Sequence, residues 1–132
     1  MWNILIADDH LVDRRIIKQF LKDKAHFHEA ADGNEAILSY NFSIRDHAPF
    51  DIVLLDLAMP KLDGHEVLRR IRESEDKRQV PINKRVLAIA ISALPQSETN
   101  LGTNAFSAYV GKPIDPKELL EKVEKVLVSR AS

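Results

Sequence analysis

The sequence predicts an α/β fold, in which helices cover a parallel five-stranded sheet, and two patterns carry this prediction. Short apolar runs alternate with longer amphipathic stretches along the whole chain, which is typical of βαβ units. Four of the apolar runs also end on polar residues, as parallel strands do where their carboxyl ends open into a binding crevice. The 132 residues contain no repeat or linker, so we expect a single domain over residues 1–132.

The first half of the chain predicts strands over 3–8 and 26–30 and helices over 11–23 and 34–44. One side of the first helix is apolar: Leu11, Ile16, Ile17, Phe20 and Leu21. The second strand is polar enough for a sheet edge, and the run Asp32-Gly33-Asn34 indicates a turn before the second helix.

The second half predicts strands over 51–56, 86–91 and 108–111 and a third helix over 64–74. Between the last two strands, residues 93–106 have little apolar periodicity and carry Pro, Gly and Asn, so we expect the fourth helix to be short or irregular.

The final helix has the clearest start. Asp115 can cap it, Pro116 suits its first position, and Glu118 completes a capping-box pattern. Its core-facing residues are expected to be Leu119, Leu120, Val123 and either Val126 or Leu127.

The composition excludes several classes of function. Nineteen Lys and Arg face 20 Asp and Glu, so no bulk charge favours nucleic acid or an anionic membrane. The absence of cysteine excludes disulfides and thiolate metal sites and fits a reducing cytosol. Every apolar run is far shorter than the roughly 20 residues that span a bilayer, and no signal peptide is recognisable. We therefore expect a cytoplasmic protein that binds neither nucleic acid nor a membrane.

Polar groups at the strand ends predict the chemistry. Asp8 and Asp9 end the first strand, Asp56 the third, Ser92 the fourth and Lys112 the fifth. Three close carboxylates repel one another, and a hard divalent cation, Mg²⁺ first, relieves this repulsion. Beside such a cation a carboxylate can attack phosphorus, a lysine can neutralise phosphoryl oxygens, and a hydroxyl can donate to them.

These residues lie in runs that resemble the receiver domain of two-component response regulators, and the match covers essentially the whole chain. The runs are ILIADDH at 4–10, DIVLLDLAMPKLDG at 51–64, ISA at 91–93 and YVGKP at 109–113. The resemblance implies a flavodoxin-like (βα)5 three-layer sandwich with strand order 2-1-3-4-5.

The resemblance also implies roles for site residues. Asp56 would accept a phosphoryl group from a histidine kinase or a histidine phosphotransfer protein, in a domain that promotes its own phosphorylation and dephosphorylation without being an enzyme. Asp9, Asp56 and the Ala58 carbonyl would bind Mg²⁺ directly, and Asp8 largely through water. Lys112 would be aimed into the site by a cis bond to Pro113.

A switch is implied as well. Ser92 would move toward the phosphoryl group and Tyr109 would rotate inward, which changes the surface formed by residues 93–106, strand 108–111 and the final helix. That surface is the expected site for a downstream protein or a homodimer.

The sequence departs from the family pattern near the phosphoacceptor. Ala58 and Leu94 stand at two positions that modulate attack by water on the aspartyl phosphate, and neither offers an amide or a carboxylate. We therefore expect no special acceleration of dephosphorylation.

Two alternative functions remain open, and so does the context in which the chain acts. A phosphatase with an aspartyl nucleophile would normally carry a second acid where Ala58 stands, and a phosphorylation-independent binding module would not need the full acid, hydroxyl and lysine set. The chain could be a stand-alone regulator, a phosphorelay intermediate or a receiver excised from a hybrid kinase. The five histidines show no metal-ligand spacing and are interpreted as surface or edge residues: His10, His26, His28, His47 and His65. His10 adjoins the acidic pair and could tune it, but the surface interpretation is favoured.

Overall fold

The computed structural model describes residues 1–96 and 106–131 and contains one sheet of five parallel strands. The strands are β1 (Trp2–Ala7), β2 (Ala25–Ala30), β3 (Ile52–Asp56), β4 (Leu87–Ser92) and β5 (Ala108–Gly111). Their order across the sheet is β2-β1-β3-β4-β5, and every neighbouring pair is parallel. The predicted strand order is therefore confirmed, and each strand lies within one residue of its expected position.

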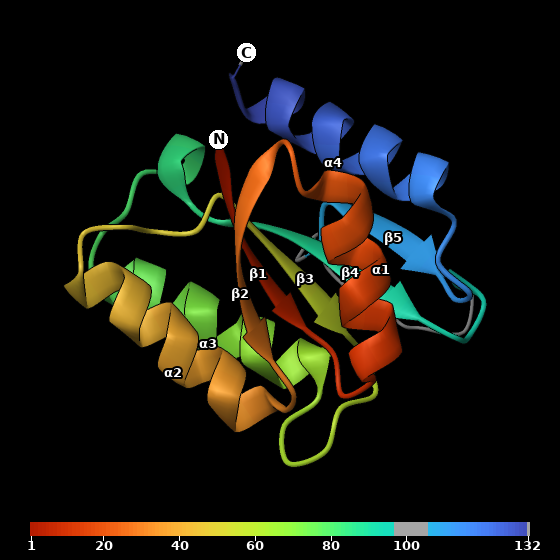
Figure 1. Cartoon of the computed structure of the whole chain (residues 1–132). Coiled ribbons are helices and arrows are strands. Elements are labelled where there is room, and N and C mark those ends of the chain that lie inside the picture. Colours follow the sequence, from red (N-terminus) through yellow and green to blue (C-terminus); the bar gives the residue numbers. More distant parts are fainter. Residues whose placement is uncertain (97–105, 132) are drawn as a thin grey trace.

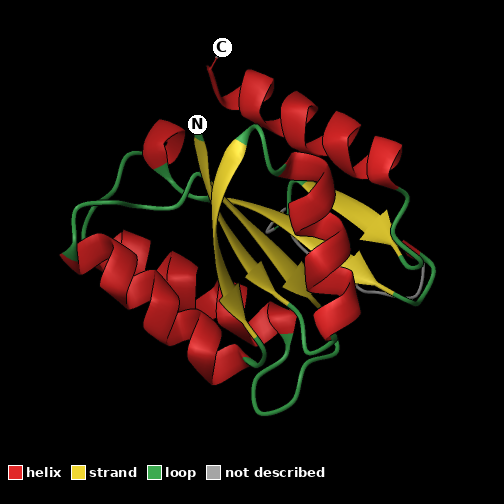
Figure 2. Cartoon of the chain, viewed as in Figure 1, coloured by secondary structure: helices red, strands yellow, loops and turns green. Residues whose placement is uncertain are grey.

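Helices cover both faces of this sheet and make a three-layer sandwich (Figures 1 and 2). They are α1 (Leu11–Leu21), α2 (Gly33–Arg45), α3 (Gly64–Lys77) and α4 (Pro116–Ala131), with a 3-10 turn at Ile82–Lys84. The label α4 belongs to the helix that the sequence predicts as the last one. The short or irregular helix expected within 93–106 falls largely on residues 97–105, which lie outside the described part of the chain.

Two apolar cores fill the sandwich. On one face of the sheet, alternate strand residues such as Ile4, Ile52 and Ile89 pack against α1 and α4. On the other face, the intervening residues pack against α2 and α3, through Tyr40 and Leu68 among others. Period-two alternation in the strands thus divides the apolar residues between the two layers.

The buried side of α1 is narrower than the sequence predicts. Ile17 and Leu21, one helical turn apart, are fully buried, and Ile16 packs against them. Leu11 and Phe20, which were expected on the same side, are 48% and 50% exposed. The sheet and α4 cover only the stripe centred on Ile17, so the prediction for Leu11 and Phe20 is wrong.

Strand β2 is the polar edge that the sequence predicts. It pairs only with β1 among the described strands, and His26, His28 and Glu29 on it are exposed. All five residues of β3, the central strand of the sheet, are buried. The buried position of β3 places its terminal residue, Asp56, at the foot of a crevice rather than on an outer surface.

Two glycines hold the loop after β3 in place. A Cβ atom on Gly64 would lie 2.6 Å from the main-chain oxygen of Asp56, and one on Gly33 would lie 2.2 Å from that of Leu62. Neither approach is possible for a larger residue without moving the backbone. The start of α3 therefore packs directly against the main chain of Asp56. The start of α2 packs against the loop after β3, at Leu62.

Capping side chains fix where three helices begin. Asp32 accepts a hydrogen bond from the Glu35 N–H (2.9 Å), and Asp63 accepts one from the Glu66 N–H (2.9 Å). At α4 the expected cap, Asp115, accepts from the Lys117 N–H (3.0 Å). Glu118, expected to complete a capping box there, pairs with Lys122 (2.8 Å). No helix in the described ranges is both long and apolar enough to cross a bilayer.

Candidate functional site

The carboxyl ends of β1, β3 and β5 bring Asp8, Asp56 and Lys112 together. Asp56 is the last residue of β3, and Asp8 and Lys112 directly follow β1 and β5. Asp56 continues the alternation of Ile52 and Leu54, so it faces the same side of the sheet as they do. Because β1 and β3 are neighbours, the two carboxylates meet; Asp8 is fully buried and Asp56 is 2% exposed.

Lys112 is the positive centre of this site. Its ammonium nitrogen lies 3.0 Å from Asp56 Oδ2, 3.1 Å from Asp8 Oδ2 and 3.0 Å from Asp13 Oδ2. Burial alone would lower the pKa of Lys112, but hydrogen bonds to Asp13, Asp56 and Asp8 outweigh burial and raise this pKa above its ordinary value. Lys112 is therefore held charged among three carboxylates.

The backbone around Lys112 is also fixed. Its N–H donates to the Ser92 carbonyl (2.8 Å), which continues the pairing of β4 with β5. The bond from Lys112 to Pro113 is cis, as the family resemblance implies.

Asp8 carries a buried oxygen that accepts no hydrogen bond. Its Oδ1 accepts from the His10 N–H (2.9 Å), whereas Oδ2 has no hydrogen-bond partner among the residues that the structure describes. The Lys112 ammonium lies 3.1 Å from Oδ2 as an ion pair and donates its hydrogen bond to the other oxygen, Oδ1 (3.4 Å). Burial, reinforced by the charge of Asp56, raises the pKa of Asp8 despite opposing contacts from His10 and Lys112. A buried anionic oxygen of this kind is a good ligand for a cation.

The arrangement can hold a metal ion. Asp8, Asp9, His10 and Asp56 each offer one ligand atom, and these atoms all lie within 4.8 Å of one another. Three carboxylates, those of Asp8, Asp13 and Asp56, lie within 3.1 Å of the Lys112 ammonium, and a fourth, Asp9, lies 3.1 Å from His10 Nδ1, so negative charge is in excess. The predicted metal residues Asp8, Asp9 and Asp56 are thus brought together.

The main chain of Ala58 also lies against the predicted phosphoacceptor, because its N–H donates to Asp56 Oδ1 (2.9 Å). This hydrogen bond helps to orient the Asp56 carboxylate. The role of the Ala58 carbonyl as a metal ligand stays a prediction.

Sequence reasoning missed two members of the cluster, Asp13 and His10. Asp13 lies in the first turn of α1, which begins two residues after Asp9, so its nearness to the acidic pair in the sequence could have identified it. His10 was interpreted as a surface residue, and its side chain is indeed 62% exposed, but its Nδ1 lies 3.1 Å from both Asp8 Oδ1 and Asp9 Oδ1. The start of α1 turns the ring toward the acids, which sequence spacing alone does not show.

The two predicted switch residues both contact Leu94. The buried Ser92 hydroxyl oxygen accepts from the Leu94 N–H (3.0 Å). The Tyr109 hydroxyl donates to the Leu94 carbonyl and lies 3.5 Å from the Ser92 carbonyl oxygen. Lys122 donates to the Tyr109 carbonyl, and its ammonium lies 5.9 Å from the Tyr109 ring centre. The switching roles of Ser92 and Tyr109 remain predictions.

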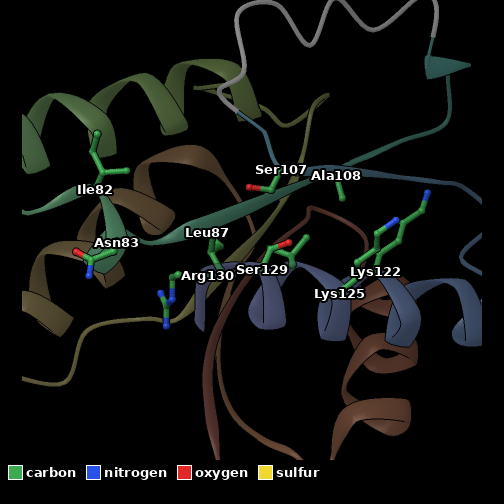
Figure 3. Close-up of a pocket in the computed structure, with 10 residues that line it drawn as sticks. Ile82, Asn83, Leu87, Ser107, Ala108, Lys122, Lys125, Ser129 and Arg130 are labelled. Carbon is green, nitrogen blue, oxygen red and sulfur yellow. The ribbon is translucent and has the colours of Figure 1, made fainter. Parts of the chain in front are cut away.

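A cavity of about 710 Å³ lies away from the acidic cluster, between the amino ends of β4 and β5 and the second half of α4 (Figure 3). Its walls include Ile82, Leu87, Ala108, Lys125 and Arg130. None of the predicted site residues lines it. Because ligands of parallel sheets bind at the carboxyl ends of the strands, the acidic cluster is the better candidate for the chemistry.

Comparison with known proteins agrees with this geometry. A family model described as the response regulator receiver domain matches residues 4–124. The chain is 37% identical to the probable transcriptional regulator ycf27 of Porphyridium aerugineum, over 98% of this chain and 50% of that protein. It is 32% identical to the chemotaxis protein CheY of Pseudomonas aeruginosa, over 93% and 94% of the two chains.

A solved structure is similar in fold and in sequence. A chain of the CheX–CheY–BeF3–Mg²⁺ complex from Borrelia burgdorferi matches with a TM-score of 0.75 and 30% identity, over 95% of this chain and 88% of that chain. The length of the relatives varies: this chain spans about half of ycf27 and of the regulator ResD of Bacillus subtilis, but most of CheY.

Proposed function

This chain belongs to the response regulator receiver family of two-component signalling, and from that premise we propose that Asp56 accepts a phosphoryl group. One observation carries the proposal: the Lys112 ammonium lies 3.0 Å from Asp56 Oδ2 at the buried end of β3. A carboxylate in this position has a positive group beside it to neutralise the incoming phosphoryl oxygens.

In the proposed reaction a phosphoryl group passes from the donor group to a carboxylate oxygen of Asp56. One Asp56 oxygen forms a bond to phosphorus, while the bond from phosphorus to the donor breaks and its electron pair leaves with the donor group. Lys112 remains charged and pairs with the phosphoryl oxygens. The Ser92 hydroxyl donates a hydrogen bond to one of them. The product is an aspartyl phosphate on the protein itself, so no external product is turned over.

We propose Mg²⁺ as the cofactor, held by Asp9, Asp56 and the Ala58 carbonyl, with Asp8 acting largely through water. The buried Asp8 oxygen without a hydrogen bond and the excess of negative charge support this assignment. When bound, the ion supplies positive charge that offsets the repulsion between the carboxylates and an anionic donor.

The proposed donor is a phosphohistidine of a sensor kinase or of a histidine phosphotransfer protein, because such donors define two-component signalling.

The proposed output surface comprises β5, the exposed side of α4 and the segment between β4 and β5, where a downstream protein or a second copy would bind. Tyr109 links this surface to the site, since its hydroxyl binds Leu94 just beyond Ser92. Residues 1–132 are proposed to act as one receiver module, either alone or within a longer protein.

Intact-protein mass spectrometry tests the proposal. The protein is incubated with acetyl phosphate and Mg²⁺, and compared with Asp56→Asn, with an EDTA sample, and with Asp23→Asn, which changes an exposed acid away from the cluster. One metal-dependent phosphoryl adduct in the wild type and in Asp23→Asn, but not in Asp56→Asn, is expected.

Other outcomes favour the alternative functions. Repeated release of phosphate from small phosphomonoesters would favour a phosphatase. A folded, Mg²⁺-loaded protein that forms no adduct, and whose partner binding is unchanged by Asp56→Asn, would favour a phosphorylation-independent module.

A further inference from the structure

His10 is the one described residue that brings a nitrogen ligand to the acidic cluster. Its Nδ1 lies 3.1 Å from Asp8 Oδ1, 3.1 Å from Asp9 Oδ1 and 3.9 Å from Asp56 Oδ2. The His10 N–H donates to Asp8 Oδ1 (2.9 Å), which fixes the backbone from which the ring projects. The exposed ring is therefore directed into the cluster by its own main chain.

The ring can present a lone pair to a cation. The Lys112 ammonium lies 3.3 Å from His10 Nδ1, and an ammonium can only donate hydrogen bonds. The Asp8 and Asp9 oxygens can only accept, so in the metal-free site they favour a proton on Nδ1, whereas the tautomer with its proton on Nε2 turns the Nδ1 lone pair toward Lys112 and the space between Asp8, Asp9 and Asp56. A cation bound among those carboxylates would meet the same lone pair.

A mixed nitrogen and oxygen ligand set changes which metals bind best. Three carboxylates alone suit hard ions such as Mg²⁺, whereas imidazole adds affinity for first-row transition ions, in the order Mn²⁺ < Co²⁺ < Ni²⁺ < Cu²⁺. The buried Asp8 Oδ2, which accepts no hydrogen bond, shows independently that the cluster presents an unsatisfied anionic ligand.

We propose that His10 Nδ1 becomes a protein ligand when the site holds a divalent transition ion, so that the site binds Mn²⁺ or Co²⁺ more tightly than Mg²⁺. This inference rests on the metal site of the proposed function and adds a residue that sets its metal preference. His10 does not take part in phosphoryl transfer in this proposal.

Pulsed electron paramagnetic resonance of the Mn²⁺-loaded full chain tests the ligand directly, because a coordinated imidazole nitrogen modulates the electron spin echo. The wild type and the control His26→Ala, which removes an exposed histidine from β2, should show the nitrogen modulation. His10→Ala should lose it while still binding Mn²⁺. Calorimetric titrations should show Co²⁺ affinity falling about tenfold in His10→Ala, with Mg²⁺ affinity little changed.

The outcomes separate this inference from the proposed function. Bound Mn²⁺ without nitrogen modulation in the wild type, or an unchanged ratio of Co²⁺ to Mg²⁺ affinity in His10→Ala, would overturn the role of His10 and leave phosphoryl transfer to Asp56 intact. A wild-type protein that binds neither Mg²⁺ nor Mn²⁺ would overturn the metal site and the inference together.

Discussion

Ser92 and Tyr109 hydrogen-bond to opposite sides of one residue, Leu94. The Ser92 hydroxyl oxygen accepts from the Leu94 N–H (3.0 Å), and the Tyr109 hydroxyl donates to the Leu94 carbonyl. A turn of Ser92 toward a phosphoryl group on Asp56 would remove the acceptor from that N–H and release the Leu94 backbone. Tyr109 would then lose its Leu94 acceptor, and the two proposed switch residues would be coupled through the main chain of Leu94.

Replacing Ser92 with alanine is expected to uncouple Tyr109 from Asp56. With 3-fluorotyrosine incorporated, the wild type should show a shift of the Tyr109 fluorine signal on addition of acetyl phosphate and Mg²⁺. Ser92→Ala should still form the adduct but show a much smaller shift, because no hydroxyl leaves Leu94.

The second tyrosine is an internal reference for this measurement. Tyr40 is buried between α2 and the other face of the sheet, so its signal should stay constant, and Tyr109→Phe assigns the two signals. An equal Tyr109 shift in Ser92→Ala would show that the coupling does not run through Leu94.

The sheet was predictable because it depends on local patterns. Apolar runs of strand length, with polar residues at their ends, set the positions of β1, β3 and β4 and brought Asp8 and Asp56 to one edge. The same rule placed Lys112 there, since β5 runs in the same direction as the other strands.

The parts that sequence reasoning missed depend on how elements turn against each other. Asp13 and His10 lie in the site because the start of α1 is close to Asp8 and Lys112. Leu94 contacts Tyr109 because the backbone after β4 turns back toward β5. Phe20 is exposed because α4 and the sheet cover a narrow stripe of α1. Apart from Asp13, whose position shortly after Asp9 can be read from the sequence, these are matters of packing, which composition and periodicity do not encode.

Removing the charge of Asp13 is expected to speed phosphorylation. The Asp13 carboxylate lies 3.0 Å from the Lys112 ammonium and competes for it with the phosphoryl oxygens. Asp13→Asn also makes the crevice less repulsive to an anionic donor, so the adduct should form several-fold faster from acetyl phosphate in time-resolved mass spectrometry. Asp23→Asn should leave the rate unchanged. A slower rate in Asp13→Asn would mean that Asp13 helps to position Lys112 for the reaction.

Neutralising Asp8 is expected to stabilise the metal-free protein at neutral pH. Because the pKa of Asp8 is raised above 3.8 in the folded state, its ionised form costs stability at pH values above the raised pKa. Asp8→Asn should increase stability in EDTA at pH 7 by about 1–2 kcal/mol, or roughly 3–6 °C in Tm.

The pH dependence of this gain is a further test. The gain should shrink as the pH falls through the raised pKa toward 3.8, where Asp8 is protonated in the folded wild type. Mg²⁺ at pH 7 should also narrow the difference, because the proposed ion would offset the charge of the wild-type Asp8 carboxylate, largely through water. Thermal melts with and without Mg²⁺ measure both effects, and a destabilised Asp8→Asn at pH 7 in EDTA would contradict the assignment.

Glu75 is expected to be important for stability. This carboxylate is 2% exposed, accepts from the Val86 N–H (2.7 Å) and pairs with Arg72 (2.6 Å), which itself donates to the Val86 carbonyl (2.7 Å). The pair thus satisfies both main-chain groups of the residue that precedes β4. Glu75→Ala should lower the free energy of unfolding by about 3 kcal/mol, measured by urea denaturation.

An acid on the solvent side of the same helix serves as the matched control. Glu73 pairs with Arg69 and Lys77, but its side chain is 53% exposed, so Glu73→Ala should cost less than about 1 kcal/mol. Equal losses in the two variants would show that burial of Glu75 does not set the difference.

The aspartyl phosphate is expected to persist well beyond seconds in the wild type. Ala58 and Leu94 stand at the two positions that, by family resemblance, modulate attack by water on the aspartyl phosphate. Both are exposed, and neither carries an amide or a carboxylate to orient an attacking water. Ala58→Asn should shorten the lifetime several-fold, since an amide would then stand beside the Asp56 carboxylate, which already receives the N–H of residue 58. The lifetime is read from the decay of the adduct after removal of acetyl phosphate, with Ala48→Asn, at an exposed alanine before β3, as the control. Loss of the wild-type adduct within seconds would show that water is oriented by another group in the crevice.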